Sequence, residues 1–147
     1  MEGFRNSKAQ DIFLCETSAL VLSKIDFVID ESKDKKFTVV LSGMSKHFSY
    51  DTVEQCSTRL KQLQSHLIGY YTQKGIFFCE NVTIIIPNIS LVEYISKEKS
   101  FGVFFEGAGK EFEYDTIEQC VGRVKQLQSH LSNYYGFMRQ KKSYTKE

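Results

Sequence analysis

The chain has 147 residues, of which 41% are hydrophobic, so it can bury one ordinary core. Its formal net charge of +1 excludes a global field that would draw it onto nucleic acid or an anionic membrane, so such binding has to be local. The sequence shows no apolar leader at its N-terminus and no run approaching the roughly 20 apolar residues of a membrane helix. We therefore expect a soluble, cytoplasmic protein.

An ungapped internal repeat runs through nearly the whole chain. Cys56 and Cys120 are separated by 120 − 56 = 64 positions, and the same offset aligns aromatic and glycine positions throughout. A match of this extent indicates internal duplication. It predicts repeat one over residues 11–74, repeat two over 75–138, and a basic C-terminal tail over 139–147.

The first forty residues of each repeat predict strands. They are rich in β-branched and aromatic residues, with short polar breaks between the apolar runs. The expected strands are 12–16, 19–23, 25–30, 36–42 and 46–50 in repeat one, and 76–80, 82–86, 90–95, 101–107 and 110–114 in repeat two.

A helix is expected to close each repeat, over 51–70 and over 115–135. Asp51 is the predicted cap and Glu54, three residues later, completes a capping box, and both recur 64 positions on. Apolar residues then alternate at spacings of three and four, which predicts one apolar seam per helix. The seams are Val53, Cys56, Leu60, Leu63, Leu67 and Tyr70, and Ile117, Cys120, Val124, Leu127, Leu131 and Tyr134.

A short antiparallel sheet with one helix buries little apolar surface alone. We therefore expect the two repeats to complete each other. The predicted fold class is α+β, with two tandem ββββ(β)α repeats related by a pseudo-twofold and forming one compact body.

Four polar residues beside each seam are identical between the repeats. They form a polar stripe of Gln55, Arg59, Gln62 and His66, matched by Gln119, Arg123, Gln126 and His130. One interpretation is a binding surface anchored by the arginines. The other is that the two helices pack on each other, so that both stripes face the same surroundings.

A second candidate site is an alternating set on the last strand of each repeat. The set is Lys46, Phe48 and Tyr50, repeated as Lys110, Phe112 and Tyr114. Side chains two apart share a face, so a base could stack on a ring while the lysine contacts a phosphate. The alternative is that the rings belong to the core beneath the following helix.

Catalytic signatures are missing from the sequence. It contains no C-x-x-C pair, no glycine-rich phosphate loop, and no nucleophile ordered with a base and an orienting group. We expect a non-enzymatic protein without a cofactor or bound metal, in which the four cysteines are reduced core residues.

Two segments, "IDESKDKKFTVVLSG" and "ISKEKSFGVFFEG", each lead from a charged turn into an apolar strand. With the strand and helix order given twice over 11–138, they resemble tandem PUR repeats, which implies interlocked units that bind single-stranded DNA or RNA. Residues 88–120 are also similar in pattern to small bacterial and phage proteins with a strand-rich body and a terminal helix. Some of those look like regulators or interaction modules.

These observations favour a non-enzymatic protein that binds single-stranded nucleic acid through paired sheets. The alternative is a bacterial or phage interaction, inhibitor or regulatory module that binds a protein or small ligand through the polar stripe or a sheet edge. A homodimer stays open as well, because an uncovered sheet edge would offer a surface to a second copy.

Overall fold

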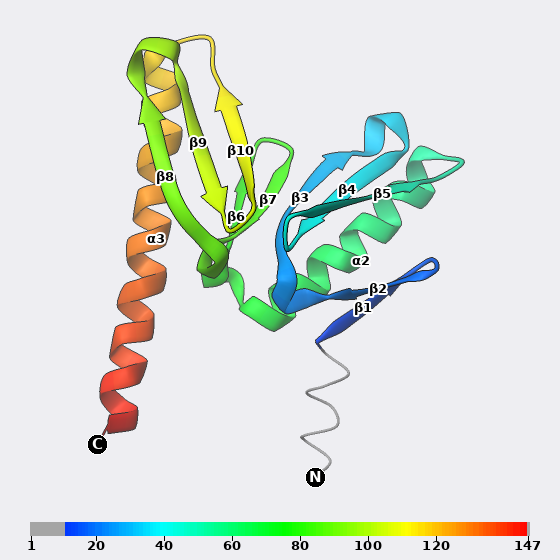
Figure 1. Cartoon of the computed structure of the whole chain (residues 1–147), viewed down its shortest axis with the longest axis horizontal. Coiled ribbons are helices and arrows are strands. Elements are labelled where there is room, and N and C mark those ends of the chain that lie inside the picture. The colour runs from blue at the N-terminus through cyan, green and yellow to red at the C-terminus, as the bar shows by residue number, and fades with distance from the viewer. Residues whose placement is uncertain (1–10, 147) are drawn as a thin grey trace. The chain divides into compact units, whose positions relative to one another are not determined.

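The computed structural model describes residues 11–146 and confirms the predicted α+β class (Figure 1). Its contacts divide the chain into two compact units, Met1–Ile85 and Ile86–Glu147. This division falls later than the predicted repeat junction between 74 and 75, because the first hairpin of repeat two belongs to the first unit. None of the helices within the described residues is both long and apolar enough to cross a membrane.

Within its described residues, 11–85, the first unit contains a two-stranded sheet, a five-stranded sheet and one α-helix. All strand pairs are antiparallel, and the five-stranded sheet has the order β5-β4-β3-β7-β6. Its elements are β1 (Ile12–Cys15), β2 (Ser18–Val21), β3 (Ile25–Glu31), β4 (Lys36–Leu41), β5 (Met44–Ser49), α2 (Val53–Tyr71), β6 (Ile76–Cys79) and β7 (Val82–Ile85).

The core of the first unit lies around α2, which Figure 1 shows between the β1–β2 hairpin and β5. The centre of the predicted seam is buried, with Leu63 and Leu67 at 0% exposure against sheet residues such as Phe37. Burying one such side chain fully contributes about 1.5–3 kcal/mol. The seam prediction is wrong at its ends, because Val53 and Tyr70 lie beyond this contact and are 41% and 37% exposed.

The start of α2 differs from the prediction by one residue. Thr52 is the N-cap: its hydroxyl accepts a hydrogen bond from the Gln55 amide at 3.1 Å, and the Gln55 side chain accepts one from the Thr52 amide at 3.3 Å. The predicted pair, Asp51 and Glu54, is therefore wrong, because the hydroxyl rather than the carboxylate lies within reach of the free amide. Gln55 thus has a structural duty at the helix start.

The second unit has a three-stranded sheet of order β10-β9-β8 and one long helix. Its elements are β8 (Ile89–Ile95), β9 (Ser100–Phe105), β10 (Ala108–Glu113) and α3 (Ile117–Lys146). Thr116 and Gln119 form the same reciprocal hydrogen bonds as the cap of α2. The helix continues beyond Tyr135, where the prediction ended it, and includes all of the predicted tail except Glu147, which lies outside the described residues.

Glycines shape the last hairpin of each sequence repeat. Gly43, between β4 and β5, has φ 82°, and Gly107, between β9 and β10, has φ 89°. Glycine adopts this left-handed region without the steric cost that a Cβ brings. Both glycines lie in the turns between these strands.

The two sequence repeats meet in one sheet. Strand β7, from repeat two, pairs with β3 of repeat one through the partners Phe27↔Ile84 and Val28↔Thr83. The prediction that one repeat completes the sheet of the other is confirmed for this hairpin. The predicted pseudo-twofold remains a prediction.

Candidate functional site

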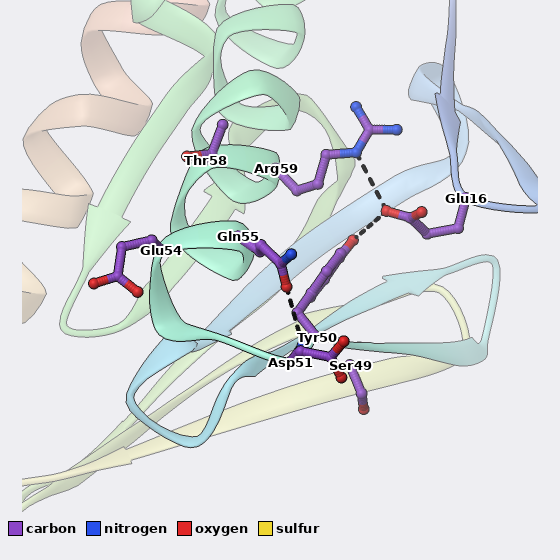
Figure 2. A pocket seen from close by; sticks show the side chains of 8 residues that line it. All are labelled: Glu16, Ser49, Tyr50, Asp51, Glu54, Gln55, Thr58 and Arg59. Atoms are coloured by element: carbon purple, nitrogen blue, oxygen red, sulfur yellow. Dashed lines mark hydrogen bonds and ion pairs between the residues drawn. The ribbon is translucent and has the colours of Figure 1, made fainter.

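The polar stripe of α2 lies against the turn of the β1–β2 hairpin (Figure 2). Arg59 Nε lies 3.3 Å from Glu16 Oε2, and the guanidinium also donates to the Leu14 carbonyl at 3.1 Å. A third bond, of 2.6 Å, joins Arg59 to the side-chain oxygen of Gln62. Arg59 therefore attaches the hairpin to the helix.

Glu16 receives a second hydrogen bond from the opposite side. The Tyr50 hydroxyl donates to Glu16 Oε2 at 2.8 Å, and Figure 2 shows the carboxylate between this hydroxyl and Arg59. The Tyr50 ring stacks on buried Phe37 with centroids 6.0 Å apart. The end of β5, the hairpin turn and α2 thus converge on one carboxylate.

The other end of the stripe also packs on the hairpin. The Arg59 guanidinium lies over the Phe13 ring, 5.3 Å from its centroid, and the His66 ring meets Phe13 edge to face at 4.9 Å. His66 Nδ1 is 2.9 Å from the Gln62 carbonyl oxygen of its own helix. These contacts give three of the four stripe residues of repeat one a role within the first unit.

Hydrogen bonding and burial set the protonation of this cluster. The hydrogen bond from Tyr50, followed by that from Arg59, lowers the pKa of Glu16 below its usual value of 4.5. Burial, and then hydrogen bonds to Cys15 and Glu16, raise the pKa of Tyr50 well above its usual range. Glu16 is therefore charged and Tyr50 neutral at pH 7, in agreement with the hydrogen bond that the Tyr50 hydroxyl donates to the carboxylate.

A hollow of about 600 Å³ lies beside this cluster. Its lining is Glu16, Ser49, Tyr50, Asp51, Glu54, Gln55, Thr58 and Arg59, all drawn in Figure 2. The lining includes three carboxylates but one guanidinium, that of Arg59, which is already paired with Glu16. The hollow therefore suits a cationic or hydroxyl-rich group better than a phosphate.

The stripe of repeat two lies on α3. Arg123 donates to the side chain of Gln126, as Arg59 does to Gln62. His130 is half-buried on the same helix. The local arrangement of arginine and glutamine is thus common to both helices, whereas a helix-to-helix contact stays a prediction.

The second predicted site divides into a buried and an accessible part. Phe48 and Phe112 are only 4% and 5% exposed, and each packs on the phenylalanine of the neighbouring strand. The prediction that these rings receive bases is corrected, because a buried ring offers no face to a ligand. Tyr50 and Tyr114 are half-buried and stack on the same phenylalanines.

The lysines of that site remain at the surface. Lys46 on β5 is exposed and Lys110 on β10 is half-exposed, with each Nζ over the phenylalanine two residues later, at 5.8 Å and 5.6 Å. A lysine stem that covers an aromatic ring keeps its ammonium at the surface. Both lysines can contact an anion.

Sequence reasoning missed Glu16, the acceptor at the centre of the cluster. The sequence carried a signal, since Glu80 occupies the same place in repeat two. In the structure, both glutamates have φ 54°. Repetition of a non-glycine residue in a turn of positive φ points to a side-chain role. Within residues 11–146, no group of three His, Cys, Asp or Glu side chains is arranged to hold a metal ion.

Comparisons with known proteins bear on the fold. No known protein family matches the chain, and no curated protein matches it. Among solved structures, it is similar to a LytTr DNA-binding domain of a methyl-accepting/DNA response regulator from Bacillus cereus. The TM-score is 0.51, with 13% identity over 80% of this chain and 96% of that domain. The two chains share a fold. At this identity, the likeness concerns the backbone arrangement and names no functional residue.

Proposed function

We propose that this protein is a non-enzymatic, cytoplasmic nucleic-acid-binding protein. The observation that carries the proposal is the shared fold, which extends over 96% of a domain described as DNA-binding. Because one fold can host several functions, the likeness suggests only the class of ligand, nucleic acid. The residues that contact this ligand have to be found on the protein surface.

Contacts to phosphate are best assigned to the lysines at the sheet edges. Lys46 lies on edge strand β5 of the first unit, and Lys110 lies on edge strand β10 of the second. Arg59 is a poorer anchor than the sequence suggested, because Glu16 already neutralises it. Local lysine contacts are also the kind of binding that a net charge of +1 permits.

Single-stranded nucleic acid is the narrower form of the proposal. The sequence suggested it from rings beside lysines, but burial of Phe48 and Phe112 removes their stacking and leaves the lysines at the sheet edges. Phosphate contacts alone act on single strands and duplexes alike. The experiment therefore has to compare the two ligands directly.

The test is fluorescence anisotropy with labelled single-stranded and duplex oligonucleotides of one sequence, titrated at salt concentrations from about 50 to 200 mM. We expect saturable binding that weakens as salt rises. Tighter binding of the single strand supports the narrower form, and tighter binding of the duplex contradicts it. Absence of binding to both ligands at about 50 mM salt overturns the proposal.

A matched pair of variants locates the contacts. The variant carries Lys46→Glu and Lys110→Glu, and the control carries Lys61→Glu and Lys125→Glu, which are exposed helix positions with the same 64-residue relationship. Both proteins have the same net charge. We expect affinity at least about tenfold lower for the sheet-edge variant than for the control. Equal losses would place the contacts elsewhere.

The hollow beside Glu16 favours a second candidate, an interaction module that binds a cationic small ligand or protein side chain. The supporting observation is the concentration of Glu16, Asp51 and Glu54 around about 600 Å³. The test is capture of a lysine-rich or arginine-rich peptide by the wild type and by Glu54→Gln. Equal capture by the two proteins, or none, counts against this candidate.

A further inference from the structure

Strand β8 presents an uncovered edge with an apolar surface. In the three-stranded sheet it pairs with β9 on one side only. Leu91 on this strand is 52% exposed, whereas Phe27, its counterpart on β3, is 3% exposed. Tyr94 and Ile95 are also exposed, at 38% and 39%. An exposed apolar edge strand is a template for another strand.

In the first unit, β3 is the counterpart of β8, and its corresponding edge is covered by β7. Strand β3 pairs with β4 on one side and with β7 on the other. The β8–β9 register repeats the β3–β4 register 64 positions later, including the shift at its start. Strand β8 is therefore built like β3 but has no counterpart of β7 within the described sheet.

A strand equivalent to β7 exists in the chain, and it is β2. The β1–β2 hairpin repeats the register of β6–β7, since Ile12↔Val21 corresponds to Ile76↔Ile85. Its outer strand pairs only with β1 in a two-stranded sheet. Within residues 11–146, the β10-β9-β8 sheet thus lacks an added hairpin, and the β1–β2 hairpin extends no larger sheet.

We infer that β2 of a second copy of this chain adds to β8, so that the internal repeat continues from one molecule to the next. The intermolecular partners follow from the β3–β7 register when β8 takes the place of β3, 64 positions later, and β2 takes the place of β7, 64 positions earlier. They are Leu20↔Leu91, Ala19↔Val92 and Ser18↔Glu93. The added strand would pair antiparallel through backbone hydrogen bonds.

The order in which the repeats pair indicates that a second copy of the chain covers the open edge of β8. Within the chain, the hairpin of the later repeat adds to the sheet of the earlier repeat. Within residues 11–146, the hairpin that has the β6–β7 register and extends no larger sheet is β1–β2, and a second molecule can supply it in this same direction. Such a head-to-tail contact is heterologous, so it produces rings or open chains of molecules.

The association should be weak, because a single added hairpin buries less than a standard interface of about 1,600 Å². Sedimentation velocity across about 10 µM to 1 mM protein is therefore the first test. We expect the average mass to rise with concentration. Leu91→Lys should raise the dissociation constant at least about tenfold, because it places a charge at the proposed contact.

The matched control is Met44→Lys, which places a lysine at a 63% exposed apolar position on β5, away from the proposed contact. It should associate like the wild type, and circular dichroism establishes that both variants fold. A monomer at about 1 mM wild-type protein overturns the inference. Equal effects of the two variants also overturn it.

A crosslinking experiment tests the register and distinguishes a second copy from the same chain. One preparation carries Ala19→Cys and another carries Val92→Cys, and the two are mixed and oxidised. Directly opposed residues lie within disulfide reach, whereas positions two residues out of register lie farther apart. The four native cysteines are buried and free, which limits their interference.

We expect a mixed disulfide between Ala19→Cys and Val92→Cys chains, and much less when Tyr94→Cys replaces the second partner. No mixed disulfide, or equal yields for both pairs, contradicts the proposed register. A single chain with Ala19→Cys and Val92→Cys provides the final comparison. Crosslinking within that chain alone, without intermolecular products, would assign the edge to its own hairpin and overturn the inference.

Discussion

Arg59 and Glu16 form an ion pair at 3.3 Å although they lie 43 positions apart in the chain. The pair joins the middle of α2 to the turn of the first hairpin. Their side chains are 31% and 47% exposed, so the pair contributes to position more than to stability. Arg59, which the sequence suggested as a ligand anchor, therefore binds the β1–β2 hairpin instead.

The first prediction concerns acid. Because the pKa of Glu16 is lowered in the folded state, its stabilising effect is present above the unfolded value near 4.5 and is lost as pH falls through the folded value. The melting temperature of the wild type should exceed that of Glu16→Gln at pH 6, and the difference should shrink below pH 4.5. Thermal unfolding from pH 3 to 6 measures this. A constant difference across that range would contradict the assignment.

The second prediction concerns the helix cap. Thr52→Ala removes the hydroxyl that accepts from the Gln55 amide, and it should cost about 1 kcal/mol of unfolding free energy. Asp51→Ala should cost less, since its carboxylate does not cap the helix. Ser65→Ala, at an exposed position in the middle of α2, is the control. Urea unfolding decides between the two caps, and a larger loss for Asp51→Ala would favour the original prediction.

The third prediction concerns the cysteines, all four of which are buried and free. Burial raises the pKa of Cys15, Cys56 and Cys120, so these thiols stay protonated and unreactive in the folded protein. Iodoacetamide at pH 8 should modify all four only after unfolding, as counted by mass spectrometry. Ser65→Cys, an exposed thiol, provides the positive control. Rapid modification of native cysteines would contradict their burial.

The fourth prediction concerns a ring that covers two glycines in the second sheet. A Cβ at Gly102 would lie 2.7 Å from the Phe104 ring, so Gly102→Ala has to displace that ring and should cost about 1 kcal/mol. The cost should largely disappear in a Phe104→Ala background, which a double-mutant cycle measures. Gly122→Ala in α3, with nothing within 4 Å, is the control and should be neutral or stabilising. Equal costs in both backgrounds would show that the ring is not responsible.

Local signals in the sequence predicted most elements of the fold. Within residues 11–146, the ten strands and two α-helices follow from β-branched and aromatic runs with polar breaks between them and from the three-four seams. The helix cap was placed one residue early, because Asp51 and Thr52 are both good caps and only the hydrogen-bond geometry separates them. The end of α3 was also missed, because apolar periodicity weakens after Tyr135 while the helix continues.

The candidate site depended on long-range contacts that no local pattern contains. The spacing of Arg59, Gln62 and His66 placed them on one helix face, but their shared neighbour, the β1–β2 hairpin, comes from a distant part of the chain. Likewise, alternation placed Lys46 and Phe48 on one face of a strand. It could not show that the helix buries the ring and leaves the ammonium outside.

The sequence by itself determined the duplication, the α+β class and the order of the elements, because these depend on residue spacing and short-range conformational preference. The tertiary structure decided which strands pair across the repeats, which arginine is neutralised and which aromatic rings are buried. Those outcomes depend on contacts between distant segments. The hairpin of repeat two therefore lies beside β3, while β8, which pairs with β9 in the register in which β3 pairs with β4, keeps an open edge.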